Sequence, residues 1–348
     1  MQPANRRPHP WAIAIAATLA LALVTALWLW QLSRQTSTRL TQPERLQCPL
    51  PQQPTHHQHA GMVWVPGGDF TFGDTVYPEE QPLRKKTVAG FWMDRTEVSN
   101  EQFAQFVRAT GYVTVAERPV DAALHSALPP EMRQPGAVVF VMPSSVSSPG
   151  KPGQWWRYVV GAQWRHPGGP GTSINGRGAF PVVAVTHADA LAYARWKGTT
   201  LPSEVQWEWA ARGAQTGAAL AAHDQPAAAN TWQGLFPVAN SGEDGFVGLA
   251  PVGCYAPNGV GLFDMIGNVW ELTADRWTPD HSTDAPPESD PAPFKRPFTS
   301  AQQVIKGGSV LCAPNYCMRY RAGARQAQEE DLAASHLGFR TILLAAPP

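Results

Sequence analysis

Proline and glycine set the strongest limit on how this chain can fold. There are 34 prolines and 30 glycines among 348 residues. Proline lacks the backbone N–H that helices and central strands need, and glycine destabilises the interior of both. Long regular helices should therefore be few, while the 14 tryptophans supply large aromatic contacts that can hold loops in place. We expect an α+β fold with few helices, short strands and long ordered loops.

An apolar stretch lies near the N-terminus, at residues 11–31. The segment from Trp11 to Trp30 carries no charge over twenty residues, about the length that crosses a hydrocarbon layer of roughly 30 Å. It is longer than the apolar core of a signal peptide, and no small-x-small cleavage site follows it. We therefore predict an uncleaved, single-pass membrane anchor, with a cleaved signal peptide as the alternative.

The chain has four predicted parts, of which the anchor is the second. We predict a tail at 1–10, the anchor at 11–31, a flexible tether at 32–60 and a globular domain at 61–345. Arginines flank both ends of the anchor, so their count does not settle its orientation. A short tail containing Arg6 and Arg7 resembles a signal anchor that keeps its N-terminus in the cytosol. We expect an extracytoplasmic (periplasmic) domain, and a cytoplasmic domain remains the alternative.

Local signals predict three helices and one hairpin. Ser99 and Gln102 have the form of a capping box, and apolar residues then recur at helical spacing until Gly111. Comparable signals predict helices at 100–110, 187–197 and 203–213. Two short alternating runs around a Gly-Gly pair predict a β-hairpin at 61–73. Beyond residue 214 the periodicity fades into turns and short strands.

The most informative chemical feature is a pair of cysteines, Cys312 and Cys317. Positions i and i+5 share a face in neither a helix nor a strand, so the sulfurs meet only if the chain turns at Pro314 and Asn315. Zinc needs further ligand pairs that the chain lacks, and thioredoxin-type Cys-x-x-Cys spacing is absent. Two possibilities remain, a structural disulfide or two thiolates for a soft ion such as Cu(I).

Other classes of chemistry are not supported. Lys and Arg number 27 and so do Asp and Glu, so no basic field suggests nucleic acid. The chain has no dinucleotide fingerprint after a strand, no Walker loop, no His-Glu-x-x-His and no Gly-x-Ser-x-Gly elbow. If the chain is an enzyme, its reactive atoms are the two sulfurs. The other cysteines, Cys48 and Cys254, are too far apart in sequence to assign, and either can be a buried or free thiol.

The segment around the cysteine pair resembles the catalytic signature of the formylglycine-generating enzymes, also called sulfatase-modifying factors. It reads Gly-Gly-Ser-x-x-Cys-x-x-x-Tyr-Cys-x-Arg-Tyr-Arg from Gly307 to Arg321, followed by Leu-Gly-Phe-Arg at 337–340. Further similar blocks occur in family order at 61–63, 93–100, 164–167, 201–204, 230–234, 242–246 and 267–271. The resemblance thus covers nearly the whole domain and implies a fold of the formylglycine-generating-enzyme, C-type-lectin-like kind.

The resemblance implies a reaction and its metal. Family members oxidise a cysteine of a sulfatase precursor, in a Cys-x-Pro-x-Arg context, to Cα-formylglycine with molecular oxygen. By analogy Cys312 and Cys317 would hold Cu(I) as a bis-thiolate, which suits a soft ion. Ser309 matches the serine beside the metal, and Trp270 matches the tryptophan that walls the oxygen pocket. Without the resemblance, Ser309 would be a turn residue and Trp270 part of the core.

Family members also bind structural calcium, for which mixed carboxylate, amide and carbonyl oxygens are suitable ligands. Carried over by position, the first set would be Asn230, the carbonyl of Thr231, Asp244 and the carbonyl of Phe246. The second set would be Asp264, the carbonyls of Gly267 and Val269, and Glu271. Without the resemblance, Asp244 lies in a polar turn and Glu271 would be a buried ion-pair member.

This chain departs from the family pattern beside the presumed substrate. The resemblance assigns Tyr316, Arg325 and His336 to substrate binding. Position 313 is alanine where the family usually has histidine, and position 336 is histidine where it usually has asparagine. The run at 326–331 also differs. We hypothesise that the His336 imidazole replaces the hydrogen-bonding group lost at Ala313.

The sequence leaves three candidate functions for this chain. The first is a copper-dependent oxidase that forms formylglycine in a sulfatase. The second is a membrane-anchored, non-catalytic binding or assembly protein in which Cys312 and Cys317 form a disulfide. The third is a related oxidase that acts on a peptide or metabolite other than a sulfatase.

Overall fold

The computed structural model describes residue 48 and the ranges 59–119, 128–147, 152–214, 229–283 and 301–344. The chain divides into two units, Met1–Leu46 and Gln47–Pro348, and every described residue belongs to the second. The expected tail and anchor therefore lie outside the described residues, as does most of the tether. In the part of the chain that is described, no helix combines the length and apolar character needed to cross a membrane.

Three α-helices occupy the described part of the chain, close to where local signals predict them. The Ser99 hydroxyl accepts a hydrogen bond from the backbone N–H of Gln102, and the side-chain oxygen of Gln102 accepts one from the backbone N–H of Ser99. Gly111 ends the helix with a left-handed backbone. The third helix ends two residues earlier than expected, because Arg212 is its C-cap. The helices are α2 (Asn100–Thr110), α3 (His187–Lys197) and α4 (Glu204–Ala211).

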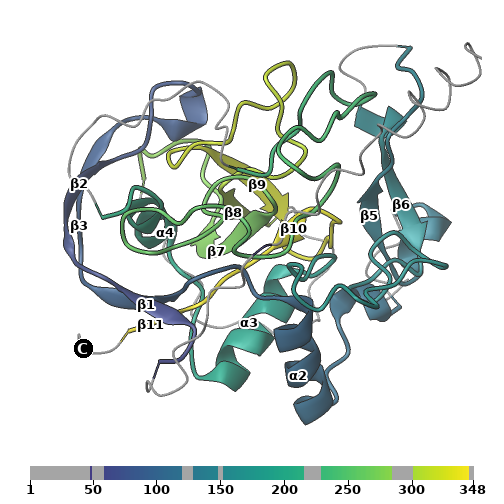
Figure 1. Ribbon diagram of the computed structural model, residues 1–348, viewed down its shortest axis with the longest axis horizontal. Coiled ribbons are helices and arrows are strands. Elements are labelled where there is room, and N and C mark those ends of the chain that lie inside the picture. Colours follow the sequence, from purple (N-terminus) through teal and green to yellow (C-terminus); the bar gives the residue numbers. More distant parts are fainter. Residues whose placement is uncertain are drawn as a thin grey trace, which may run out of the picture. The chain divides into compact units, whose positions relative to one another are not determined.

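Short strands form two sheets and two ribbons (Figure 1). The four-stranded sheet has the order β10 (Leu337–Gly338), β7 (Trp270–Arg276), β8 (Gln302–Lys306) and β9 (Arg325–Glu329). The three-stranded sheet has the order β1 (Met62–Val65), β4 (Phe91–Asp94) and β11 (Ile342–Leu343). The ribbons are β2 (Gly68–Phe72) with β3 (Arg84–Val88), and β5 (Gly136–Phe140) with β6 (Trp156–Val160). Four 3-10 helices complete the described elements: η1 (Pro78–Glu80), η2 (Val115–Glu117), η3 (Pro130–Arg133) and η4 (Pro152–Gln154).

The hairpin predicted at 61–73 is wrong. Both strands exist, but β1 pairs with β4 and β2 pairs with β3, in different sheets. The intervening Gly67 is pressed against the β3–β4 connection, since a Cβ there would lie 2.6 Å from the carbonyl oxygen of Val88. The connection is therefore a crossing between sheets, which short-range alternation cannot distinguish from a hairpin turn.

Aromatic side chains fill the core, as the tryptophan content suggests. Trp207, Trp209, Trp232 and Trp270 are all fully buried. Helix α4 packs against β2, β3, β7 and β8, while α2 and α3 pack against each other. Figure 1 shows β7, β8 and β9 in the middle of this unit, with the β5–β6 ribbon on one side and β2–β3 on the other. The expected α+β class with few helices and short strands is confirmed.

Candidate active site

The cysteine pair lies on a single turn in the loop between β8 and β9. The carbonyl of Ala313 accepts hydrogen bonds from the backbone N–H groups of Tyr316, at 3.1 Å, and Cys317, at 3.0 Å. This turn brings the sulfurs of Cys312 and Cys317 to 3.0 Å, both buried and both free thiols. A disulfide bond would be about 2.05 Å long. The predicted turn is confirmed, and its two sulfurs are in non-covalent contact.

Two glycines shape the approach to the first cysteine. Gly307 and Gly308 both have positive φ, at 94° and 74°, which strongly favours glycine. A Cβ on Gly308 would lie 2.7 Å from the carbonyl oxygen of Arg319 and 3.3 Å from the sulfur of Cys312. Glycine is therefore required here both for the backbone conformation and for the position of the sulfur.

Of the other two predicted catalytic residues, Ser309 contacts the turn of the pair, and Trp270 lies in the hydrophobic cluster that contains both cysteines. Ser309 is fully buried; its carbonyl accepts from the backbone N–H of Cys312 at 2.9 Å, and its hydroxyl accepts from that of Leu311 at 3.2 Å. Trp270 belongs to the same hydrophobic cluster as both cysteines. Its backbone N–H donates to the carbonyl of His336 at 2.9 Å. The structure thus brings Ser309, Trp270 and the two sulfurs into one region.

The two sulfurs differ in electrostatic character. Burial raises the pKa of Cys312 well above its usual value. A hydrogen bond from the Cys312 thiol lowers the pKa of Cys317 to about 7, and the nearby Arg319 acts in the same direction. Near neutral pH the pair therefore readily holds one thiol and one thiolate, with Cys312 as donor.

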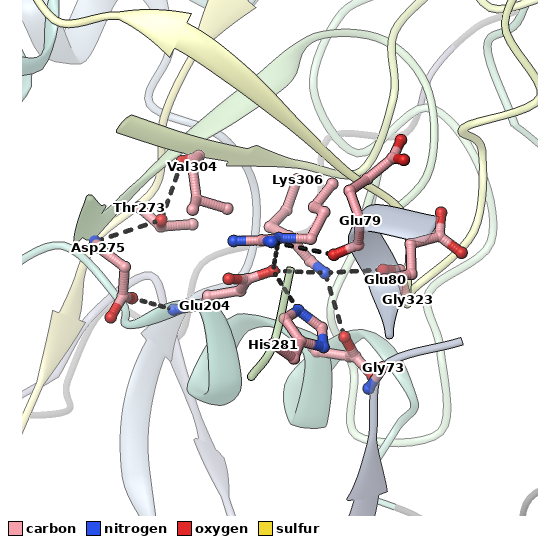
Figure 2. Close-up of polar contacts among 12 residues, drawn as sticks. Gly73, Glu79, Glu80, Glu204, Thr273, Asp275, His281, Val304, Lys306 and Gly323 are labelled. Carbon is pink, nitrogen blue, oxygen red and sulfur yellow. Dashed lines mark hydrogen bonds and ion pairs between the residues drawn. The ribbon is translucent and has the colours of Figure 1, made fainter. Parts of the chain in front are cut away.

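The segment between β8 and β9, residues 307–324, is called the cysteine loop. Buried ion pairs stabilise it from both sides. Before the loop, the Lys306 ammonium lies 3.4 Å from Glu204 and 3.1 Å from Glu208, and it donates to the carbonyl of Gly323 at 3.2 Å. Figure 2 shows Glu204 as the shared partner of Lys306 and His281. The attraction of Lys306 offsets the effect of burial and lowers the pKa of Glu204 to about 2.

Three arginines that follow the cysteine pair make comparable contacts. Arg319 pairs with Glu79 at 2.5 Å, and Arg321 pairs with Glu80 at 2.6 Å and with Asp74. Arg325 pairs with Glu204 at 2.9 Å and is almost fully enclosed. Its guanidinium also donates to two backbone carbonyls, those of Glu79 and Thr278. The structure therefore places Arg325 in the network that holds the loop, and its proposed contact with substrate stays a prediction.

Tyr316 and His336 border one aromatic cluster. Tyr316 is 44% exposed and stacks on Phe236 with ring centroids 4.1 Å apart. Phe236 contacts Phe140, Phe140 contacts Trp156, and Trp156 contacts the His336 imidazole, with centroid distances of 5.6, 5.7 and 4.7 Å.

The His336 imidazole is electrically neutral at physiological pH. Burial lowers its pKa to about 4, and Nδ1 has no hydrogen-bond partner among the described residues. Ala313 is buried beside the same aromatic rings. The hypothesis that His336 replaces a group lost at Ala313 stays a prediction.

The first candidate calcium set comes together in space. The carboxylate of Asp244 accepts from the backbone N–H groups of Thr231, at 3.0 Å, and Phe246, at 3.2 Å. The side-chain oxygen of Asn230 is buried and has no hydrogen-bond partner in the described ranges. A buried amide oxygen without a partner is a suitable ligand for a hard cation.

The second candidate set fits calcium less well. Both carboxylate oxygens of Glu271 are bound by Arg340, at 2.6 and 2.7 Å, and one also accepts from the Trp207 indole at 2.8 Å. Asp264 accepts from the backbone N–H of Gly253 at 2.5 Å. The backbone N–H of Gly267 donates to the carbonyl of Gly307 at 2.9 Å. Val269 is buried in the core.

Sequence reasoning missed a third carboxylate next to the second set. Glu97 is fully buried, and burial together with the charge of Asp264 raises its pKa well above the usual value. Neither calcium set contains three acidic, histidine or cysteine side chains, and within the described ranges no group of three or more such residues is arranged to hold a metal.

A disulfide joins the remaining cysteines, Cys48 and Cys254. The bond connects residues 206 positions apart, and no local pattern in the sequence indicates it. Cys48 falls in the segment expected to be a tether, so that segment is fastened to the domain at this point. The loop that carries Cys254 also meets the first candidate calcium set, because the hydroxyl of Tyr255 donates to the carbonyl of Asp244 at 3.0 Å.

A loop-rich α+β domain with a buried, free cysteine pair on one turn defines a thiol-centred protein. Residues 47–345 match the family described as Sulfatase-modifying factor enzyme 1-like domain, and the chain belongs to this family.

Named relatives agree with this assignment, and one solved structure shares the fold. A formylglycine-generating enzyme of Mycobacterium tuberculosis is 47% identical over 81% of this chain and 97% of its own length. One of Mus musculus is 43% identical over 80% of this chain and 74% of its own length. An inactive C-alpha-formylglycine-generating enzyme 2 of Mus musculus is 36% identical over 87% of this chain and 92% of its own length. The structure of PvdO from Pseudomonas aeruginosa shares the fold, with a TM-score of 0.54 and 23% identity over 82% of this chain and 95% of its own.

Proposed function

We propose that this protein is a copper-dependent oxidase that converts a cysteine of a sulfatase, in a Cys-x-Pro-x-Arg context, to Cα-formylglycine with molecular oxygen. The observation that carries the proposal is the pair of buried free thiols, Cys312 and Cys317, 3.0 Å apart on one turn. Relatives named formylglycine-generating enzyme, 43 to 47% identical over four fifths of the chain, support it.

The donor set suits Cu(I). Two sulfur ligands in an apolar cluster favour a soft ion over zinc or a hard cation. When bound, copper would supply the one-electron and oxygen chemistry that side chains lack. The residues of the chain would hold the ion, order the turn around it and exclude water. Cys312 and Cys317 hold the ion, Ser309 orders the turn through its backbone and hydroxyl bonds, and Trp270 helps to exclude water.

The reaction needs an external reductant. Converting a CH₂SH group to an aldehyde removes two electrons, whereas reducing oxygen fully to water takes four. An external thiol can donate the missing pair. The substrate cysteine, oxygen and two external thiol molecules then give the aldehyde, hydrogen sulfide, water and the external disulfide.

The surface around the pair supports a peptide substrate. The half-exposed Tyr316 stands one residue before Cys317 and presents an aromatic face supported by Phe236 and Trp155. Such a surface can pack against apolar parts of a peptide, and neutral His336 can hydrogen-bond to peptide groups without adding charge.

Location and anchoring form part of the proposal. The Cys48–Cys254 disulfide supports an oxidising compartment, because disulfides persist outside the reducing cytosol. With an anchor at 11–31, the domain would then face the extracytoplasmic side. A cytoplasmic domain would be expected to carry these cysteines reduced.

Identity to relatives does not by itself separate the alternatives, because a relative named inactive is 36% identical to this chain. A non-catalytic binding protein would take up no Cu(I) through its thiols. An oxidase acting on another peptide would bind copper but leave sulfatase peptides unchanged. The substitutions at Ala313 and His336 make this second alternative worth testing.

The proposal is tested with detergent-solubilised full-length protein loaded with Cu(I), a Cys-x-Pro-x-Arg peptide, oxygen and an external thiol. Mass spectrometry should show that the peptide loses H₂S and gains one oxygen atom, while a peptide with serine in place of cysteine stays unchanged. The same assay with His336→Ala tests whether this imidazole contributes to turnover. Tight copper uptake without aldehyde from several such peptides would rule out the sulfatase reaction.

We also propose that Asn230, Thr231, Asp244 and Phe246 bind a structural calcium ion. The unpartnered Asn230 oxygen supports this set over the one around Glu271. Calcium should raise the melting temperature of the wild type and leave that of Asp244→Asn almost unchanged, measured after removal of metals by a chelator. Equal stabilisation of both proteins would exclude calcium binding by this set.

A further inference from the structure

A cavity of about 380 Å³ lies between the C-terminal end of β4 and the first turns of α2. Its volume falls within the roughly 300–1,000 Å³ that small-molecule sites occupy. The described residues that line it belong neither to the cysteine loop nor to either candidate calcium set. The proposed oxidase reaction therefore leaves this cavity without a role.

Arg95 lines the cavity and is held in a fixed position. Its backbone N–H donates to the carbonyl of Gly61 at 3.0 Å, and its carbonyl accepts from the backbone N–H of Phe263 at 2.8 Å. The guanidinium lies 5.2 Å from the centroid of the Phe263 ring. Within the described part of the chain this guanidinium makes no hydrogen bond and no ion pair. Its donors are therefore available to a carboxylate, which arginine can bind through two parallel hydrogen bonds.

Glu101 supplies an unpaired charge of the opposite sign in the same cavity. It lies in the first turn of α2, is exposed, and forms no ion pair with Arg95 or with any other described residue. Gln105 lines the cavity one helical turn later, and its amide can both donate and accept a hydrogen bond. The remaining acidic residue of the described lining, Asp94, is already paired with Lys197 at 2.5 Å. The described lining therefore leaves one positive and one negative charge for a ligand.

Two opposite charges that line one cavity without pairing complement a ligand that carries both. Inorganic phosphate would be attracted by Arg95 and repelled by Glu101, and a metal cation would be attracted by Glu101 and repelled by Arg95. Because the two side chains do not form an ion pair with each other, the charges of the ligand must also be separated. The ammonium and carboxylate groups at the two ends of a dipeptide meet this requirement.

We propose that this cavity binds a dipeptide-sized zwitterion. The carboxylate of the ligand contacts the Arg95 guanidinium, its ammonium group contacts the Glu101 carboxylate, and Gln105 forms a hydrogen bond with the peptide group between them. A few convergent polar groups of this kind fix the orientation of ligands in small-molecule sites.

Isothermal titration calorimetry on the detergent-solubilised full-length protein tests this site with alanylalanine as the probe. The wild type should bind alanylalanine more tightly than N-acetyl-alanylalanine, which lacks the ammonium group, and alanylalanine amide, which lacks the carboxylate. Arg95→Gln should weaken alanylalanine binding about tenfold, because hydrogen bonds between charged groups are lost, and should leave binding of the amide unchanged. Glu101→Gln should weaken alanylalanine binding about two- to fivefold, since this carboxylate is exposed, and should leave binding of the N-acetyl peptide unchanged.

Arg177→Gln is the matched control. Arg177 also has its guanidinium over a phenylalanine ring, 5.1 Å from the centroid of Phe180, but it does not line the cavity, so its loss should leave alanylalanine affinity unchanged. Thermal unfolding confirms that each variant is folded.

The inference is overturned if the wild type does not bind alanylalanine, or if either folded variant, Arg95→Gln or Glu101→Gln, binds it as tightly as the wild type. It is also overturned if Arg177→Gln weakens binding as much as Arg95→Gln does, or if the site binds inorganic phosphate more tightly than alanylalanine. Copper uptake and peptide oxidation are measured separately, so each of these outcomes leaves the proposed function intact.

Discussion

Cys317→Ser should abolish formylglycine formation while leaving the fold intact. Serine occupies nearly the same volume and keeps a group that can accept a hydrogen bond from Cys312, so the buried turn should persist. A hydroxyl oxygen is, however, a hard donor that Cu(I) disfavours. Loss of one of two ligands should remove tight copper binding and reduce turnover to background, measured by chelator competition and by the peptide mass assay.

The double variant Cys48→Ser/Cys254→Ser provides the control. It removes the same kind of atoms, but from the disulfide rather than from the thiol pair. This variant should melt at a lower temperature and still bind Cu(I) and form the aldehyde. If Cys317→Ser retained either copper affinity or turnover, the bis-thiolate site would be wrong. If purified protein showed no titratable thiols, the disulfide alternative would gain support.

The helices were predictable because their signals are local. A capping box such as Ser99 with Gln102, and a left-handed glycine such as Gly111, act within a few residues of each other and depend little on the rest of the fold. The β1–β2 hairpin failed for the opposite reason. Strand pairing is decided by distant partners, and the strands that flank Gly67 join different sheets.

The candidate site also contains a part that local sequence predicts and a part that it does not. A turn between Cys312 and Cys317 follows from their spacing and from Pro314 and Asn315, and the structure confirms it. The assignment of Ser309 and Trp270 came from the family resemblance; Ser309 contacts the turn, Trp270 shares its hydrophobic cluster, and their catalytic roles stay predictions.

Long-range contacts could not be predicted from the sequence. The Cys48–Cys254 disulfide spans 206 positions, and the Arg319–Glu79 pair joins residues 240 positions apart. The contact of the Arg325 guanidinium with Glu204, a residue of α4, is equally invisible in the local sequence. The predicted contact of Arg325 with substrate stays a prediction.

Lys306→Met should be the most destabilising single substitution among the charged residues that hold the cysteine loop in place. Lys306 is fully buried, and its acidic partners are Glu204, which is labelled in Figure 2, and Glu208. Methionine fills most of the volume but leaves these carboxylates with less compensating charge. Removing one partner of a buried ion pair costs about 3 to 5 kcal/mol of unfolding free energy, which denaturant titration can measure.

Two further variants identify the cause of this loss. Lys306→Met/Glu208→Gln should recover part of the stability, because it removes one of the carboxylates left short of a partner. Arg165→Met breaks an ion pair whose side chains are 40% and 19% exposed, and should cost only about 0 to 1 kcal/mol. A loss from Lys306→Met no larger than that of Arg165→Met would mean that water or rearranged side chains compensate the carboxylates. The buried pairs would then not be what holds the cysteine loop in place.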